Sequence, residues 1–251
     1  MPSRSHRLFA FATLALLAWP LSAKDLLVSA AASLSDAFKE IGSQYQQQNP
    51  GVTVRLNTAG SGTLLQQLLQ GAPVDVLATA DQQTMDTAVA KQAVQPGSRK
   101  TFVRNDLVLV VPAASALRPQ QLSDLQQSGI ARIALSNPDS VPVGRYAKAA
   151  LSKAGLFERL QPKIITTQNV RQSLNYVARK EVNAGFVYRT DAALMPDKVR
   201  VTATVALDTP VSYPIAVTSS SRQKAEAQRF VDFVLSPAGQ KVLQKYGFSR
   251  P

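Results

Sequence analysis

Small and hydroxyl-bearing residues follow the apolar segments of this sequence at several points. Ser33 comes directly after the apolar run 26–32, Ser61 lies in the small-residue segment 57–63, and Tyr188 ends the apolar run 184–188. A helix that begins directly after a strand leaves backbone N–H groups without intrahelical partners, at the positive end of its dipole. Such a junction can bind an anion. A single Ser-capped helix is ordinary, and only the recurrence of the arrangement points to a binding site.

Two absences exclude most catalytic chemistry. The sequence has no Cys, and its one histidine is His6. Because His6 lies in a segment that we expect to be removed, Ser-His-Asp and Cys-His catalysis and His-containing zinc sites are excluded. An exported enzyme that uses carboxylates as acid and base, for example Asp36, Asp75 or Asp81, remains an alternative.

The N-terminus predicts export. Arg4 and Arg7 precede the apolar run 8–19, and residues 21–23 supply a small-residue cleavage site. We therefore expect residues 1–23 to be a cleaved signal peptide, with Lys24 as the mature N-terminus.

The charge of the chain favours small anions over nucleic acid. Without residues 1–23 the formal net charge falls from +12 to +10, and the Lys and Arg residues are scattered, with no run and no interleaved aromatic stripe. Nucleic acid is therefore not an expected partner. The positive surface would steer anions mildly.

Strands and helices alternate along the mature chain, which predicts an α/β fold with mostly parallel sheets. The second half of the chain repeats the βα pattern of the first, so two lobes are expected, each a sheet flanked by helices. Four strand-to-helix junctions and the strand end at Tyr188 resemble one another, because small or hydroxyl-bearing residues stand where the strand ends. The expected strands are 26–32, 52–56, 74–78, 107–111, 130–135, 164–166 and 184–188.

Local signals predict how the helices begin. Ser33 with Asp36 three residues later matches a capping box with Asp in place of Glu. Asp81 and Asn169 are predicted to cap the helices that follow them. Gly60 and Gly62 would let the backbone approach a ligand closely.

The C-terminal part is expected to return to the first lobe. An extended segment at 210–217 precedes two helices, at 223–234 and 237–245. The predicted organisation is lobe I at 24–103 plus 213–251, and lobe II at 104–212.

The whole mature chain resembles the periplasmic molybdate-binding proteins of ABC transporters, which have the type II periplasmic binding fold with a ligand cleft between the lobes. The individual matches are short, but their joint order and spacing are specific. They lie at 30–34, 71–75 with 80–82, 141–148, 170–171, 185–188 and 246–248.

This resemblance implies a site. Proteins of that family hold a tetrahedral oxyanion with neutral hydrogen-bond donors. Carried onto this chain, Ser33 and Ser61 would each give a hydroxyl and a backbone N–H, Val143 and Val170 would give backbone N–H groups, and Tyr188 would give its phenol.

The chain departs from the family pattern in two places. Gly60 and Gly62 stand where further serines are common, which predicts a more flexible loop. Val143 replaces a commoner Ala and adds bulk near the pocket.

The resemblance further implies a periplasmic solute-binding protein rather than an enzyme. It would capture molybdate, and also tungstate, and deliver the anion to a membrane permease, as a monomer and without a cofactor or metal cation. A carrier of sulfate or another oxyanion with the same fold is the second alternative.

Overall fold

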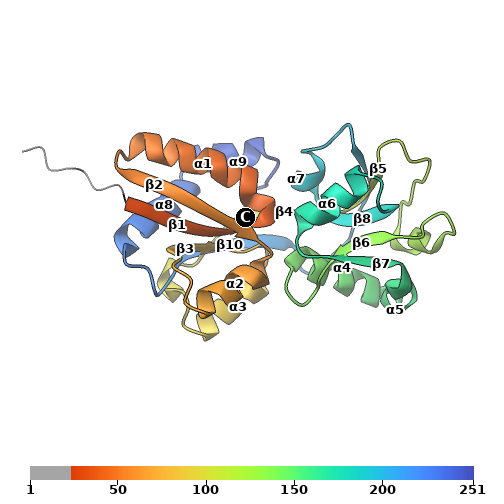
Figure 1. Ribbon diagram of the computed structural model, residues 1–251, viewed down its shortest axis with the longest axis horizontal. Coiled ribbons are helices and arrows are strands. Elements are labelled where there is room, and N and C mark those ends of the chain that lie inside the picture. The colour runs from red at the N-terminus through yellow and green to blue at the C-terminus, as the bar shows by residue number, and fades with distance from the viewer. Residues whose placement is uncertain (1–23) are drawn as a thin grey trace, which may run out of the picture.

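Two five-stranded sheets organise the chain. The computed structural model describes residues 24–251, and the expected signal peptide at 1–23 lies outside the described residues. The strand order is β2-β1-β3-β10-β4 in the first sheet and β7-β6-β8-β5-β9 in the second. The two sheets with their helices form two lobes side by side (Figure 1).

Most strands of each sheet run in one direction, as predicted. In the first sheet only β10 runs against the other four, and in the second only β5 does so. The strands of the first sheet are β1 (Lys24–Ala31), β2 (Val52–Ala59), β3 (Val76–Ala78), β4 (Lys100–Asn105) and β10 (Val211–Val217). Those of the second are β5 (Leu107–Pro112), β6 (Ile133–Ser136), β7 (Ile164–Thr167), β8 (Ala184–Tyr188) and β9 (Val199–Thr204).

Helices cover both faces of each sheet. In the first lobe α1, α8 and α9 pack together on one face, and α2 and α3 lie on the other (Figure 1). In the second lobe α6 contacts β8 and β6, while α4 packs on the same strands with α5 beside it. The helices are α1 (Ser35–Gln48), α2 (Ser61–Leu69), α3 (Gln82–Ala90), α4 (Pro142–Lys153), α5 (Phe157–Leu160), α6 (Val170–Ala178), α7 (Arg189–Ala192), α8 (Lys224–Leu235) and α9 (Pro237–Lys245).

The apolar periodicity of the sequence accounts for the core. In α1, Phe38, Ile41 and Tyr45 share one face and are buried. The rings of Phe38 and Tyr45 both make edge-to-face contacts with the Phe230 ring from α8. Burial of one such side chain stabilises the fold by about 1.5–3 kcal/mol. This packing holds the C-terminal helices on the first lobe, as the sequence predicts.

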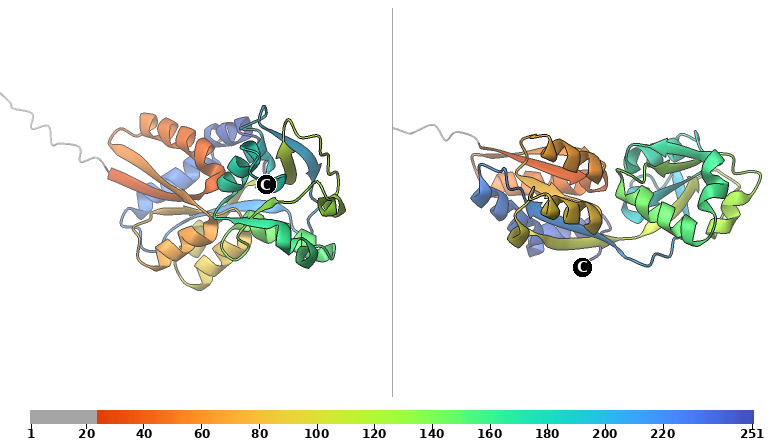
Figure 2. Two further views of the ribbon diagram at one scale, coloured as in Figure 1. Left: turned by 45° about the vertical axis from the view of Figure 1, so that its right-hand side comes forward. Right: turned by 90° about the horizontal axis from the view of Figure 1, so that it is seen from below.

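The chain crosses between the lobes twice (Figure 2). Only Asp106 separates β4 from β5, and residues 205–210 lead back from β9 to β10. The expected lobe boundaries, after residue 103 and before residue 213, fall inside β4 and β10. The predicted boundaries therefore lie before the end of β4 and after the start of β10, because both strands continue in extended conformation to the crossing points.

Two of the predicted helix caps are confirmed. The Asp81 carboxylate accepts a hydrogen bond from the Thr84 N–H at 3.2 Å, and the Asn169 amide oxygen accepts one from the Gln172 N–H at 3.0 Å.

Within residues 24–251, none of the helices combines the length and the apolar character that a membrane crossing needs.

Candidate functional site

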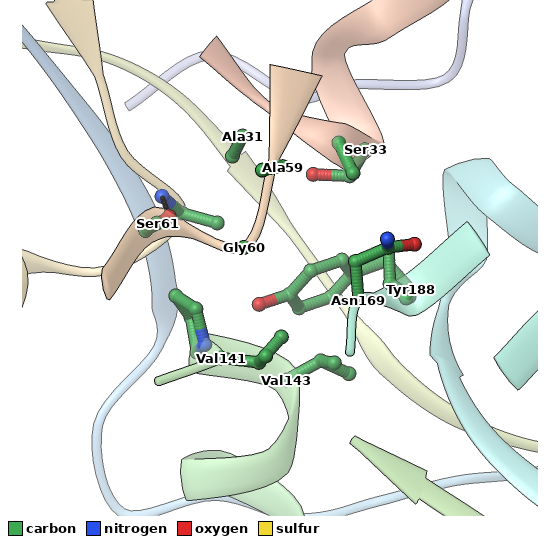
Figure 3. A pocket seen from close by; sticks show the side chains of 13 residues that line it. Ala31, Ser33, Ala59, Gly60, Ser61, Val141, Val143, Asn169 and Tyr188 are labelled. Atoms are coloured by element: carbon green, nitrogen blue, oxygen red, sulfur yellow. Dashed lines mark hydrogen bonds between the residues drawn. The ribbon is translucent and has the colours of Figure 1, made fainter. Parts of the chain in front are cut away.

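One small cavity lies between the lobes, and all five residues singled out from the sequence line it (Figure 3). Ser33 and Ser61 come from the first lobe, and Val143, Val170 and Tyr188 from the second. The other lining residues are Ala31, Ala32, Ala59, Gly60, Ala80, Val141, Pro142 and Asn169.

Ser33 lies in a short 3-10 turn, Ala32–Leu34, between β1 and α1. The predicted capping box is wrong, because α1 begins after Ser33 and no side chain of residues 24–251 caps it. The Ser33 hydroxyl instead lies 3.1 Å from the Tyr213 hydroxyl, and the Asp36 carboxylate binds Arg171.

Ser61 is the first residue of α2 and is fully buried. Its hydroxyl oxygen accepts a hydrogen bond of 3.0 Å from the Ala80 N–H, just beyond the end of β3. A backbone N–H can only donate, so the proton of the Ser61 hydroxyl remains available to another acceptor.

The two valines contribute through the backbone. Val143 is the second residue of α4, after Pro142, and Val170 is the first residue of α6, after the cap Asn169. N–H groups in the first turn of a helix have no intrahelical acceptor. Both helix N-termini therefore present donors and positive partial charge where these residues line the cavity.

Tyr188 ends β8 with its ring buried and its hydroxyl directed into the cavity (Figure 3). Within residues 24–251 the hydroxyl oxygen makes no hydrogen bond. Burial raises the pKa of Tyr188 well above its ordinary value of 10, so the phenol stays protonated at neutral pH. A buried, unpaired hydroxyl costs about 1–3 kcal/mol. The expected ligand would supply its missing partner.

The cavity suits a very small ligand that accepts hydrogen bonds. Thirteen residues enclose it, and all of them except Asn169 and Tyr188 are small or aliphatic. No carboxylate is among the lining side chains of the described chain, and the amide oxygen of Asn169 is engaged as a helix cap. Hydroxyls and helix N-termini thus dominate the polar lining.

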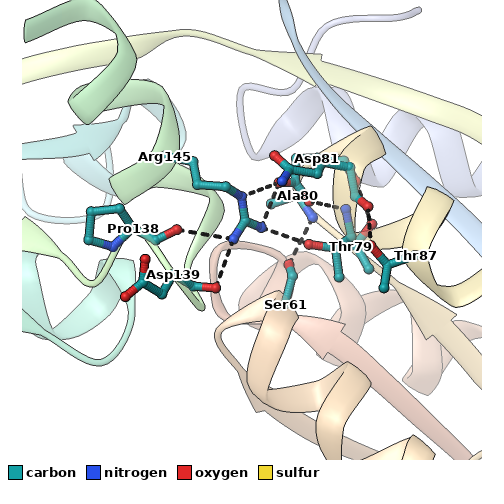
Figure 4. Close-up of polar contacts among 10 residues, drawn as sticks. Ser61, Thr79, Ala80, Asp81, Thr87, Pro138, Asp139 and Arg145 are labelled. Atoms are coloured by element: carbon teal, nitrogen blue, oxygen red, sulfur yellow. Dashed lines mark hydrogen bonds and ion pairs between the residues drawn. The ribbon is translucent and has the colours of Figure 1, made fainter. Parts of the chain in front are cut away.

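Beside the cavity, an ion pair joins the lobes (Figure 4). Arg145 from α4 reaches Asp81 of the first lobe with an Nη2–Oδ2 distance of 2.6 Å, and its Nη2 also donates to the Thr84 hydroxyl at 2.7 Å. Arg145 and Asp81 side chains are only 19% and 6% exposed. This buried pair therefore links the two lobes directly.

A second arginine crosses the gap at Ser33. Arg171 from α6 donates to the Asp36 carboxylate at 2.7 Å and to the Ser33 carbonyl at 3.3 Å. Its Nε also lies 2.6 Å from the fully buried Asp191 carboxylate. Burial raises the pKa of Asp191 to about 6, and the positive charge of Arg171 opposes that rise.

Gly60 and Gly62 of the first lobe allow the two lobes to approach each other closely. The Gly62 N–H donates to the Ser140 carbonyl of the second lobe at 2.9 Å. A Cβ at Gly62 would lie 2.7 Å from that oxygen, and one at Gly60 would lie 3.0 Å from the Val141 side chain. Gly62 thus serves contact between the lobes.

The carboxylates that an enzyme would need are occupied elsewhere. Asp36 and Asp81 bind arginines, and Asp75 accepts hydrogen bonds from the Leu27 N–H and the Ser221 hydroxyl. None of the three lines the cavity. The geometry therefore lends no support to carboxylate catalysis there.

Sequence reasoning did not identify Arg145, Arg171 or Tyr213 as parts of the site. Arg145 and Arg171 stand in segments that carry the family resemblance, which was the one signal pointing to them. Tyr213 gave no signal, because its hydroxyl meets Ser33 across 180 residues of sequence.

Two α/β lobes joined by two crossing segments, with a small donor-lined cavity between them, define a two-lobed solute-binding protein. The chain belongs to the bacterial extracellular solute-binding protein family, whose model matches residues 26–249.

Relatives and solved structures agree with this assignment. The molybdate-binding protein ModA of Escherichia coli (strain K12) is 37% identical over 232 residues, covering 89% of this chain and 88% of the relative. A periplasmic molybdate-binding protein of Azotobacter vinelandii has a TM-score of 0.78 at 24% identity, covering 90% of this chain and 99% of that one. The sulfate-binding protein SubI of Mycobacterium tuberculosis H37Rv has a TM-score of 0.79 at 16% identity, covering 90% and 87%. The last two matches support the fold alone.

Proposed function

We propose that this protein captures molybdate between its lobes, through Ser33, Ser61, Val143, Val170 and Tyr188. The observation that carries the proposal is the buried Tyr188 hydroxyl, which points into a donor-lined cavity and makes no hydrogen bond within residues 24–251. A fully deprotonated oxyanion accepts from every such donor. The 37% identity to a molybdate-binding protein over most of both chains supports molybdate in particular.

The mechanism is closure of the lobes around the anion. The donors come from both lobes, so they converge on one ligand only in the closed form. A ligand that makes contacts only in that form shifts the equilibrium toward it. Helix N-termini and hydroxyls, rather than Lys or Arg, offset the two negative charges of the ligand.

Discrimination against phosphate follows from the donor set. Near neutral pH phosphate carries at least one proton, and that O–H needs an acceptor once water is excluded. No carboxylate among the described lining residues provides one. An unpaired buried O–H costs about 1–3 kcal/mol. Molybdate avoids this cost because it is fully deprotonated.

Tungstate has the same charge and shape and is proposed to bind as well. Sulfate is also deprotonated but smaller, so donors fixed for the larger anion would contact it poorly. A sulfate carrier remains the second candidate, because a sulfate-binding protein shares the fold. The comparison at 37% identity favours molybdate.

We further propose that the protein works outside the cytoplasmic membrane and passes the anion to an ABC transporter permease. The predicted signal peptide at 1–23 and membership of an extracellular solute-binding family support this role.

Equilibrium dialysis of the mature chain against molybdate, with molybdenum counted by elemental analysis, tests the proposal. One molybdenum per chain is expected, and a chelator of divalent cations should not change the count. A chain that retains no molybdenum above the dialysis buffer would refute the proposal.

A further inference from the structure

Three hydrogen-bonded side chains, those of Asn105, Tyr213 and Ser33, lead from the first crossing point to the cavity. Asn105, at the end of β4, donates through Nδ2 to the Tyr213 hydroxyl at 3.2 Å and to the Thr190 hydroxyl at 2.8 Å. The Tyr213 hydroxyl lies 3.1 Å from the Ser33 hydroxyl. Tyr213 is fully buried and Ser33 nearly so.

The direction of these hydrogen bonds can be assigned from donors that cannot reverse. The Asp106 backbone N–H donates to Asn105 Oδ1 at 2.9 Å. Because a backbone N–H cannot accept, this contact fixes the amide oxygen of Asn105, and its NH₂ group must face Tyr213. The Tyr213 oxygen therefore accepts from Asn105.

The Tyr213 proton must then go to another oxygen. Burial raises the pKa of Tyr213 well above 10, so the phenol keeps its proton. The Ser33 hydroxyl is the remaining partner of the Tyr213 hydroxyl among the hydrogen bonds of the described chain. If Tyr213 donates to Ser33, the single proton of Ser33 is left for the cavity.

We infer that Tyr213, held by Asn105, is a positioning residue that makes Ser33 a hydrogen-bond donor to the bound oxyanion. The Ser61 hydroxyl is also left with its proton free for the ligand, because its oxygen accepts from the Ala80 N–H. This inference rests on the proposed function, and it adds that selectivity for a proton-free anion depends on a residue outside the cavity lining. Because its own proton then points into the cavity, the Ser33 hydroxyl meets the ligand as a donor, which suits a proton-free anion.

A double-mutant cycle tests the inference. Tyr213→Phe keeps the ring and its edge contacts with Tyr188, at 5.8 Å, and Phe248, at 5.4 Å between centroids. We expect this change to weaken molybdate binding on the order of 5- to 20-fold, since an oriented bond to a charged ligand is disturbed. In a Ser33→Ala background it should change affinity by less than about 2-fold, because the hydroxyl that it orients is gone.

Tyr45→Phe is the matched control. It also removes a buried tyrosine hydroxyl from the first lobe, one that donates to Glu226, away from the cavity. It should leave molybdate affinity unchanged in both backgrounds. Asn105→Ala, measured in the same cycle, gives a second measurement if Tyr213→Phe does not fold, and its effect should likewise disappear when Ser33 is replaced.

The outcomes separate the inference from the proposed function. Equal weakening by Tyr213→Phe with and without Ser33 would show a purely structural role and overturn the inference, while molybdate binding by the unchanged chain would stand. No molybdate binding by the unchanged chain would overturn both. The inference is supported if Tyr213→Phe weakens molybdate binding in the unchanged chain but has no effect on affinity in the Ser33→Ala background.

Discussion

Replacement of Tyr188 by Phe should move stability and affinity in different directions. Its hydroxyl is buried in the cavity and makes no hydrogen bond within the described part of the chain. Removing it therefore takes no bond away from the ligand-free closed fold. It does remove one donor that the oxyanion would use.

The expected magnitudes follow from the same geometry. A hydrogen bond to a charged ligand contributes about 1.5–3 kcal/mol, so molybdate affinity should fall on the order of 10- to 100-fold. The ligand-free protein should melt at the same temperature or higher, by roughly 2–4 °C for each kcal/mol gained in a chain of this size. Thermal unfolding without ligand and calorimetric titration with molybdate measure the two effects.

Tyr45→Phe provides the opposite control. Its buried hydroxyl donates to Glu226, so its loss should lower the melting temperature without changing affinity. A ligand-binding role for the Tyr188 hydroxyl would be excluded if Tyr188→Phe lowered the melting temperature while molybdate affinity stayed constant. That result would mark Tyr188 as an ordinary core residue.

Four further predictions follow from the site and its surroundings. Ser33→Ala and Ser61→Ala should each weaken molybdate binding on the order of 10- to 100-fold while the fold survives, as titration would show; unchanged affinity in both would remove these hydroxyls from the site. Phosphate at moderate excess should not displace bound molybdate near pH 7, and displacement at comparable concentrations would require an acceptor in the cavity. Arg145→Ala removes a buried pair that joins the two lobes, so we expect closure to be disfavoured and affinity to fall on the order of 10- to 100-fold; Arg55→Ala, which breaks an exposed pair within the first lobe, should have no effect, and equal effects would exclude a role in closure. Burial raises the pKa of Asp191 to about 6 from an ordinary 3.8, so the folded chain holds a proton that the unfolded chain has lost, and this group's contribution to the free energy of unfolding should fall by about 3 kcal/mol as pH rises from about 4 to 6. Denaturant unfolding of Asp191→Asn across that range should lack this decline, and an unaltered slope would contradict the assignment.

Local sequence signals predicted the parts of the fold that local interactions determine. Asp81 and Asn169 cap helices as expected, because a side-chain cap needs only the next few residues. The apolar strand 184–188 and the helix 237–245 have the predicted bounds. The strands β4 and β9 were missed, since both are edge strands with mixed polar and apolar residues.

Contacts between distant segments could not be predicted in this way. The expected capping role of Ser33 and Asp36 was wrong because their side chains bind distant partners instead. Ser33 contacts Tyr213, 180 residues away, and Asp36 binds Arg171, 135 residues away. Nothing in the spacing near Ser33 shows that either partner will be there. The five lining residues were gathered by the family resemblance, and backbone donors such as Val143 leave no side-chain signal at all.

A cavity lined by donors should select a proton-free tetrahedral dianion. Calorimetric titration of the mature chain with molybdate, tungstate, sulfate and phosphate at pH 7 tests it most directly. This selectivity predicts tight one-to-one binding of molybdate and tungstate, clearly weaker binding of sulfate and none of phosphate. Phosphate binding as tight as molybdate binding, or no heat with any of the four anions, would contradict it.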